Sequence, residues 1–118
     1  MRIGFLLLSA LLTVACGRDG GPPLAEGDTE RGRQLLRQFA CGSCHDIPGV
    51  AAAMGNVGPP LGGVARRAYL AGVLPNSPQN MAAFIREPQK ADPRTAMPAM
   101  GVTEDQARDM TAYLYTLR

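Results

Sequence analysis

Apolar positions recur at helical spacing at both ends of the chain's compact part, and no segment alternates apolar and polar residues as a half-buried strand does. Leu35, Leu36 and Phe39 fall on one side of a helix predicted over residues 28–40. Gly32 lies in the middle of that helix, where glycine costs about 1 kcal/mol relative to alanine. We therefore expect Gly32 to permit a close contact with another helix.

Capping signals indicate where the helices begin. Asp28 or the next residue can cap the first helix. The Ser-Pro pair at residues 77–78 predicts a second helix that ends before Pro88. The sequence Thr-Glu-Asp-Gln at residues 103–106 is a capping box, and it predicts a last helix that runs to about Leu117.

The segments between these helices are rich in helix breakers. Residues 46–63 contain five Gly and three Pro without a helical period, which predicts a long loop. Residues 63–70 can form a short helix, and residues 88–102 are predicted to form a second loop. The pattern as a whole favours an all-α domain of four to five short helices.

The N-terminal segment is a separate unit. Ile3 to Ala15 form an apolar stretch that is too short to cross a bilayer and is typical of a signal-peptide core. It ends in Leu-Thr-Val-Ala-Cys, which resembles a bacterial lipobox and predicts lipidation of Cys16. The alternative is ordinary cleavage near Ala15, which would leave Cys16 as a free thiol. We expect a signal peptide at 1–15, a lipid-attached flexible tether at 16–27 and one domain at 28–118.

Composition limits what this domain can be. Only 5% of residues are aromatic, Trp is absent and the net charge is +2, with no basic run, so the chain gives no sign of nucleic-acid binding. A domain of this size buries a modest fraction of its surface and is marginally stable without a covalent or metal staple. We therefore expect a bound group to complete the core.

The pentapeptide Cys-Gly-Ser-Cys-His at residues 41–45 contains the single histidine of the chain. Cys41 and Cys44 can each add to a vinyl group of a porphyrin, and His45 can then ligate the iron, so the motif predicts covalent attachment of one haem c. A thiol–disulfide pair would be typical of a βαβ context and would not need the histidine. A zinc site requires about four N or S ligands, and only three lie together here.

A second axial ligand of the iron can be sought by elimination. Without another histidine, the sixth position belongs to Met or Lys or is open, and a thioether suits haem iron. Met81 and Met110 lie at helical spacing among apolar residues, which indicates core packing, and Met54 follows His45 too closely to reach the opposite haem face. Met97 and Met100 remain as candidates in the loop at 88–102. Pro98 favours an extended conformation at Met97.

Taken together, these motifs resemble a class I c-type cytochrome over residues 27–118, and especially the cytochrome c domain fused to subunit II of some haem–copper oxidases. Gly58-Pro59-Pro60-Leu61 is similar to the family's Gly-Pro-x-Leu motif, and the segment from Pro93 to Pro98 is similar to its ligand loop. The resemblance implies an all-α class I cytochrome c fold around one covalent haem. Arg94 departs from the family, which usually has Gly at that position.

The resemblance also assigns roles to single residues. Pro59 would accept a hydrogen bond from the ring of His45, which fixes the ring and raises its basicity. Leu61 would line the cofactor site, Thr95 would bind a haem propionate and Met97 would be the second iron ligand. The resulting metal ligands are His45 and Met97.

The function implied is that of a single-electron carrier without enzymatic turnover, because His/Met coordination leaves no position for a substrate. The expected partners are redox proteins, either membrane respiratory complexes or a terminal oxidase or reductase. We expect an exported monomer on the periplasmic or extracytoplasmic face of a bacterial membrane, held there by the lipid at Cys16. The alternative is a haem peroxidase or small-gas sensor whose sixth ligand is labile or absent.

Overall fold

The structure is a computed structural model that describes residues 25–118. The predicted signal peptide, the lipidation of Cys16 and most of the predicted tether lie outside the described residues. Within residues 25–118, no helix has the length and apolar character needed to cross a membrane.

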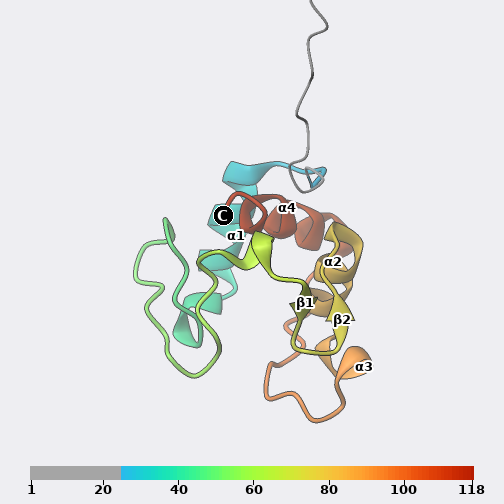
Figure 1. Ribbon diagram of the computed structural model, residues 1–118. Coiled ribbons are helices and arrows are strands. Elements are labelled where there is room, and N and C mark those ends of the chain that lie inside the picture. The colour runs from blue at the N-terminus through green and yellow to red at the C-terminus, as the bar shows by residue number, and fades with distance from the viewer. Residues whose placement is uncertain (1–24) are drawn as a thin grey trace, which may run out of the picture.

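The described residues form four α-helices, two 3₁₀ turns and one short hairpin. In chain order these are α1 (Thr29–Gln38), 3₁₀ turns at Cys41–Ser43 and Val64–Arg66, β1 (Tyr69–Leu70), β2 (Leu74–Pro75), α2 (Pro78–Arg86), α3 (Pro88–Ala91) and α4 (Glu104–Leu114). Helices α1 and α4 cross at one end of the fold, and α2 packs against α4. Two irregular arms descend from the α1–α4 pair: the long loop that follows the first 3₁₀ turn, and the hairpin with α2, α3 and the loop after it (Figure 1).

The capping predictions are confirmed. The Asp28 side chain accepts a hydrogen bond from the amide of Arg31, and Ser77 caps α2. Thr103 and Gln106 form the reciprocal capping box of α4. The first and last helices end at Gln38 and Leu114, slightly before their predicted ends.

The crossing of α1 and α4 depends on Gly32. A Cβ atom placed on Gly32 would lie 1.9 Å from the carbonyl oxygen of Asp109, so only glycine allows the two backbones to approach this closely. The buried carboxylate of Asp109 also accepts a hydrogen bond of 2.8 Å from the amide of Asp28. The Nε atom of Arg31 lies 2.5 Å from the other carboxylate oxygen of Asp109. The first turn of α1 is thereby fixed to the middle of α4.

Two local predictions are wrong. The helix expected at 63–70 is limited to the turn Val64–Arg66, and the chain then forms the antiparallel pair β1–β2. Ala71 and Gly72, which connect the two strands, both have positive φ, so this segment turns back on itself and does not continue a helix. The loop expected at 88–102 begins with the short helix α3, because proline is well suited to a first helical position.

One cluster of buried apolar side chains forms the core, and it includes Met81 and Met110 as predicted. Asn76 connects three elements around this core. Its side-chain nitrogen donates to the carbonyls of Val64 and Arg67, and its oxygen accepts a hydrogen bond of 2.7 Å from the Tyr115 hydroxyl on the segment that ends α4. Burial raises the pKa of Tyr115, so the phenol keeps its proton and this bond to a more alkaline pH than an exposed tyrosine would.

Candidate functional site

The Cys-Gly-Ser-Cys-His motif lies directly after α1. Ala40 adopts the left-handed conformation with φ of 54°, which ends the helix and turns the chain into the 3₁₀ turn Cys41–Ser43. The amides of Cys44 and His45 both donate to the carbonyl of Cys41, at 3.3 and 3.0 Å. Because residues three and four apart in a helical turn share one side, the two thiols and the imidazole belong to a single compact turn.

The surroundings of Cys41 do not favour the thiolate that a thiol–disulfide pair uses. Cys41 and Cys44 are both free and half-buried. Burial raises the pKa of the Cys41 thiol, whereas reactive cysteines in redox pairs have lowered pKa values that favour the thiolate. Within residues 25–118, no group of three or more His, Cys, Asp or Glu side chains is placed to hold a metal ion.

The ring of His45 is held from one side by the loop at 46–63. Its Nδ1 atom lies 2.7 Å from the carbonyl oxygen of Pro59, which is the contact that the resemblance implies for this pair. With Nδ1–H donating to this carbonyl, the Nε2 atom keeps its lone pair for a metal ion. Gly58 allows the approach, since a Cβ atom there would lie 2.5 Å from the ring atom Cε1 of His45.

The same loop folds back over the thiol motif at a second point. The amide of Gly55 lies 3.0 Å from the carbonyl of Gly42 and 3.2 Å from that of His45. A Cβ atom on Gly42 would lie 2.4 Å from the Ala53 side chain, and one on Gly55 would lie 2.5 Å from the backbone of Cys44. Gly42 and Gly55 were not predicted as site residues from the sequence. The glycine content of this part of the chain was the one signal that its backbone segments approach closely.

Met54 lies next to the residue that follows His45. It pairs with Asp46, the residue after His45, in an isolated β-bridge, and its side chain is 82% exposed. The exclusion of Met54 as the second iron ligand stays a prediction.

Met97 lies in the second arm, in the loop that follows α3. Gln89 on α3 donates a hydrogen bond of 2.7 Å to the Met97 carbonyl, and Thr95 Oγ1 accepts one of 3.3 Å from the Met97 amide. Accepting this bond leaves the hydroxyl proton of Thr95 available for a second partner. Met97 is half-buried, and Met100 is 46% exposed.

The turn before Met97 does not need the glycine that the family usually has. Asp92 organises it, because its side chain accepts a hydrogen bond from the Arg94 amide and its carbonyl accepts one from the Thr95 amide. Arg94 is not among the described residues with positive φ. An arginine is therefore compatible with this turn.

The last helix connects to the His45 side of the site through Tyr113. The Tyr113 hydroxyl donates a hydrogen bond of 2.6 Å to the carbonyl of Pro48, and a Cβ atom on Gly49 would collide with that hydroxyl. Leu61, predicted as a site residue, is half-buried and packs against the core. Both contacts attach the loop at 46–63 to the rigid helices.

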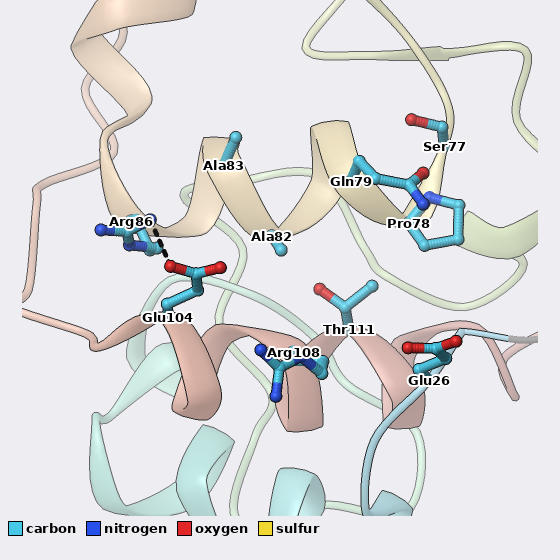
Figure 2. A pocket seen from close by; sticks show the side chains of 10 residues that line it. All are labelled: Glu26, Ser77, Pro78, Gln79, Ala82, Ala83, Arg86, Glu104, Arg108 and Thr111. Atoms are coloured by element: carbon cyan, nitrogen blue, oxygen red, sulfur yellow. Dashed lines mark ion pairs between the residues drawn. The ribbon is translucent and has the colours of Figure 1, made fainter.

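A separate pocket lies between α2 and α4 (Figure 2). Arg86 and Glu104 face each other across it at 4.0 Å, and Arg108, which also lines it, pairs with Asp105. None of the site residues predicted from the sequence lines this pocket. We therefore assign it no part in the chemistry of the thiol motif.

The donor set fits a covalently attached porphyrin. Two free thiols and an imidazole with one nitrogen already hydrogen-bonded are the groups needed for thioether attachment and axial ligation. Cys41 is itself among the partly buried side chains that pack against the core. The others are Ala25, Phe39, Leu61, Leu74, Ala82, Tyr113 and Leu117.

Comparisons with known proteins agree with this geometry. A family model described as cytochrome c matches residues 29–118. Cytochrome c oxidase subunit 2 of Alkalihalophilus pseudofirmus is 33% identical over 89 residues, which are 75% of this chain and 25% of that relative. The chain thus spans about a quarter of this curated relative's length. The solved structure of cytochrome c2 from Rhodobacter sphaeroides is similar in fold, with a TM-score of 0.55 at 20% identity, over 78% of this chain and 97% of that one.

Proposed function

This chain belongs to the cytochrome c family, and from that premise we propose that Cys41 and Cys44 hold its haem while His45 and Met97 ligate the iron. Membership of the family establishes three general properties: a class I cytochrome c fold, one covalent haem c, and electron transfer without enzymatic turnover. The expected all-α class I fold and the expected cofactor are therefore confirmed. The residue assignments, the ligand pair and the partners are our proposal.

The observation that carries the proposal is the contact between His45 and Pro59. His45 lies in the same turn as two free thiols, Cys41 and Cys44. The bound iron supplies a one-electron Fe(III)/Fe(II) couple. The carbonyl of Pro59 holds the imidazole in one tautomer and orientation, and this raises its basicity as a ligand. Thr95 is assigned to a propionate and Leu61 to the apolar wall, and Gln89 fixes the backbone that presents Met97.

The assignment of Met97 is tested by comparing two methionines in one loop. Met97→Ala should abolish the sulfur-to-iron charge-transfer band of the oxidised protein, lower its potential and allow the reduced protein to bind CO. Met100→Ala is the matched control, because it lies three residues away, is more exposed and should leave all three properties unchanged. Loss of the band in Met100→Ala alone would reassign the ligand.

CO binding also decides between electron transfer and the alternative of a peroxidase or gas sensor. A thioether that stays on the iron blocks small ligands, so reduced wild-type protein should not bind CO at neutral pH. Ready binding of CO by the wild type would favour the alternative.

We further propose that the protein is exported and attached to the outer face of a bacterial membrane through a lipid on Cys16, as a monomer. The support is the apolar stretch Ile3–Ala15 followed by a lipobox-like sequence. Its partners would then be membrane respiratory proteins, and the similarity to a protein named cytochrome c oxidase subunit 2 supports this class of partner. Cys16→Ser should move the haem-loaded protein from the membrane to the soluble fraction. An unmodified N-terminal cysteine in the membrane-bound protein, seen by mass spectrometry, would refute lipidation.

A further inference from the structure

Pro48 and Gly49 are the central residues of a turn that follows His45 closely. The amide of Val50 donates a hydrogen bond of 3.1 Å to the carbonyl of Ile47, which closes the turn over four residues. Proline in the second position and glycine in the third, with φ of 80° at Gly49, are the features of a type II turn. Type II differs from type I in the orientation of the central peptide unit. The direction of the Pro48 carbonyl therefore distinguishes the two forms.

Tyr113 on α4 donates a hydrogen bond of 2.6 Å to that carbonyl. Proline has no backbone N–H, so the carbonyl is the only main-chain hydrogen-bonding group of Pro48. Within residues 25–118, Tyr113 is the one donor to it. Gly49 leaves room for the phenol, because a Cβ atom there would collide with the Tyr113 hydroxyl. The hydroxyl thus selects one orientation of the central peptide unit of the turn.

The backbone between His45 and this turn is held mainly by its own loop. The carbonyl of Asp46 accepts a hydrogen bond of 2.8 Å from the amide of Leu61, and the amide of Ile47 donates one of 3.0 Å to the carbonyl of Ala53. All these partners belong to the irregular loop at 46–63. The bond from Tyr113 is different, because it joins the segment after His45 to a helix.

Both terminal helices meet at this turn. Arg33 on α1 contributes a longer contact, with its Nη1 atom 3.5 Å from the carbonyl of Gly49. Helix α1 crosses α4 and leads directly into Cys41, the first residue of the thiol motif. The motif is therefore attached to the helix pair where it begins, through α1, and again shortly after it ends, through Tyr113.

We propose that Tyr113 is a positioning residue for the axial imidazole: its hydroxyl fixes the turn, and the turn fixes the backbone that carries His45. The inference rests on the proposed function, because it takes His45 as an iron ligand. The imidazole is then held in two ways, by the carbonyl of Pro59 at Nδ1 and by the anchored backbone that follows it. Partners of this kind orient a metal ligand and maintain its basicity.

Loss of the Tyr113 hydroxyl should therefore change the properties of the iron in the holoprotein. A more basic imidazole favours Fe(III), so an imidazole less well aligned with Pro59 favours Fe(II) and raises the potential. In Tyr113→Phe we expect the equilibrium constant for reduction to rise about threefold, about 30 mV for a one-electron couple. The haem methyl resonances of the oxidised protein should also shift in NMR spectra, because they depend on the orientation of the imidazole plane.

Tyr115→Phe is the matched control. The Tyr115 hydroxyl also donates one hydrogen bond, of 2.7 Å to Asn76, and Tyr115 is the more buried of the two tyrosines. Its loss should therefore change the unfolding equilibrium at least as much as Tyr113→Phe does, about two- to tenfold. The potential and the haem methyl resonances should stay as in the wild type. A role of Tyr113 in stability alone would leave both properties unchanged in both variants.

A double-mutant cycle tests the contact between the turn and the phenol. Gly49→Ala places a methyl group against the Tyr113 hydroxyl, and the positive φ at this position adds the same strain in either background. Removal of the hydroxyl should relieve the collision, since the ring atom Cζ lies 3.6 Å from the position of the Cβ atom. In chemical unfolding, Gly49→Ala should change the unfolding equilibrium about tenfold more in the wild type than in Tyr113→Phe.

The outcomes separate this inference from the proposed function. Unchanged iron properties in Tyr113→Phe, equal changes in Tyr115→Phe, or additive effects in the cycle overturn the positioning role and leave the electron carrier intact. Oxidised wild-type protein that lacks the resonances of an iron-bound imidazole overturns the proposed ligand, and the inference with it. A change at the iron confined to Tyr113→Phe, together with coupling to Gly49, supports the positioning role.

Discussion

Gly58 is the residue that lets the long loop reach the imidazole of His45, the proposed iron ligand. A side chain at this position would occupy space already held by the ring of His45, whose Cε1 atom lies 2.5 Å from the position of a Cβ atom. The amide of Gly58 also donates a hydrogen bond of 2.8 Å to the carbonyl of Cys44. The residue cannot move away from the ring without breaking that bond.

We expect Gly58→Ala to displace either the His45 ring or the loop. The overlap should cost about 1–3 kcal/mol of unfolding free energy, the range typical of overpacked sites, and should lower the yield of haem-loaded protein. Chemical denaturation and a haem stain on a denaturing gel measure the two effects.

Gly62→Ala is the matched control in the same loop. Its Cβ atom would lie 3.4 Å from Pro48, an ordinary contact, and Gly62 does not have positive φ. Its effect should stay within about 0.5 kcal/mol. Equal losses in both variants would mean that the contact with His45 is not the cause.

At the scale of the elements, the crossing of α1 and α4 allows a test in which helix propensity and packing have opposite signs. Gly32→Ala would stabilise an isolated helix by about 1 kcal/mol. In this fold the new methyl group would overlap the carbonyl of Asp109, so we expect net destabilisation of about 1–3 kcal/mol or more. Thermal or chemical unfolding of the holoprotein measures the difference. Gln34→Ala, exposed on the same helix, should change stability little, and a stabilised Gly32→Ala variant would contradict the close crossing.

Helix α3 gives a second prediction at this scale, because it holds the loop of the proposed ligand Met97 through Gln89. Gln89→Ala removes the hydrogen bond to the Met97 carbonyl, a loss of about 0.5–1.5 kcal/mol. The sulfur-to-iron band should then disappear at a lower temperature, while global unfolding changes less. Lys90→Ala, which removes an exposed ion pair from the same helix, is the control and should leave the band unaffected. A band equally stable in both variants would exclude a positioning role for Gln89.

Some elements could be predicted from the sequence and others could not, for physical reasons. The starts of three helices could be predicted from Asp28, Ser77 and Thr103, because capping is an interaction between residues close together in the sequence. The hairpin β1–β2 has no apolar alternation, since each strand has two residues, and it depends on contacts made by Asn76 with distant segments. The close approaches of Gly42 and Gly55 are likewise tertiary, so a glycine-rich stretch predicted only a loop. The contact of Pro59 with His45 could be predicted through the family resemblance and not from periodicity, and the role of Met97 stays a prediction that rests on the same resemblance.

At the scale of the whole molecule, we expect the haem to complete a small apolar core. The double variant Cys41→Ala, Cys44→Ala should lose covalent haem and accumulate little folded protein, because the remaining core has too little buried apolar area. Yield of soluble protein and circular dichroism measure this. Ser43→Ala, which lies between the thiols and keeps both, should fold as the wild type does. A double variant that is stably folded without haem would refute this account of the core.

The contact between α1 and α4 also bears on the order in which the molecule is assembled. Gly32 and Asp109 come from opposite ends of the domain, so their contact can form only after both helices are present and a large loop is closed. Until α4 packs against α1, the thiols and the imidazole therefore belong to an incompletely folded chain. We expect the porphyrin to be attached while the chain is incompletely folded. The packing of α1 against α4 would then follow attachment and enclose the porphyrin.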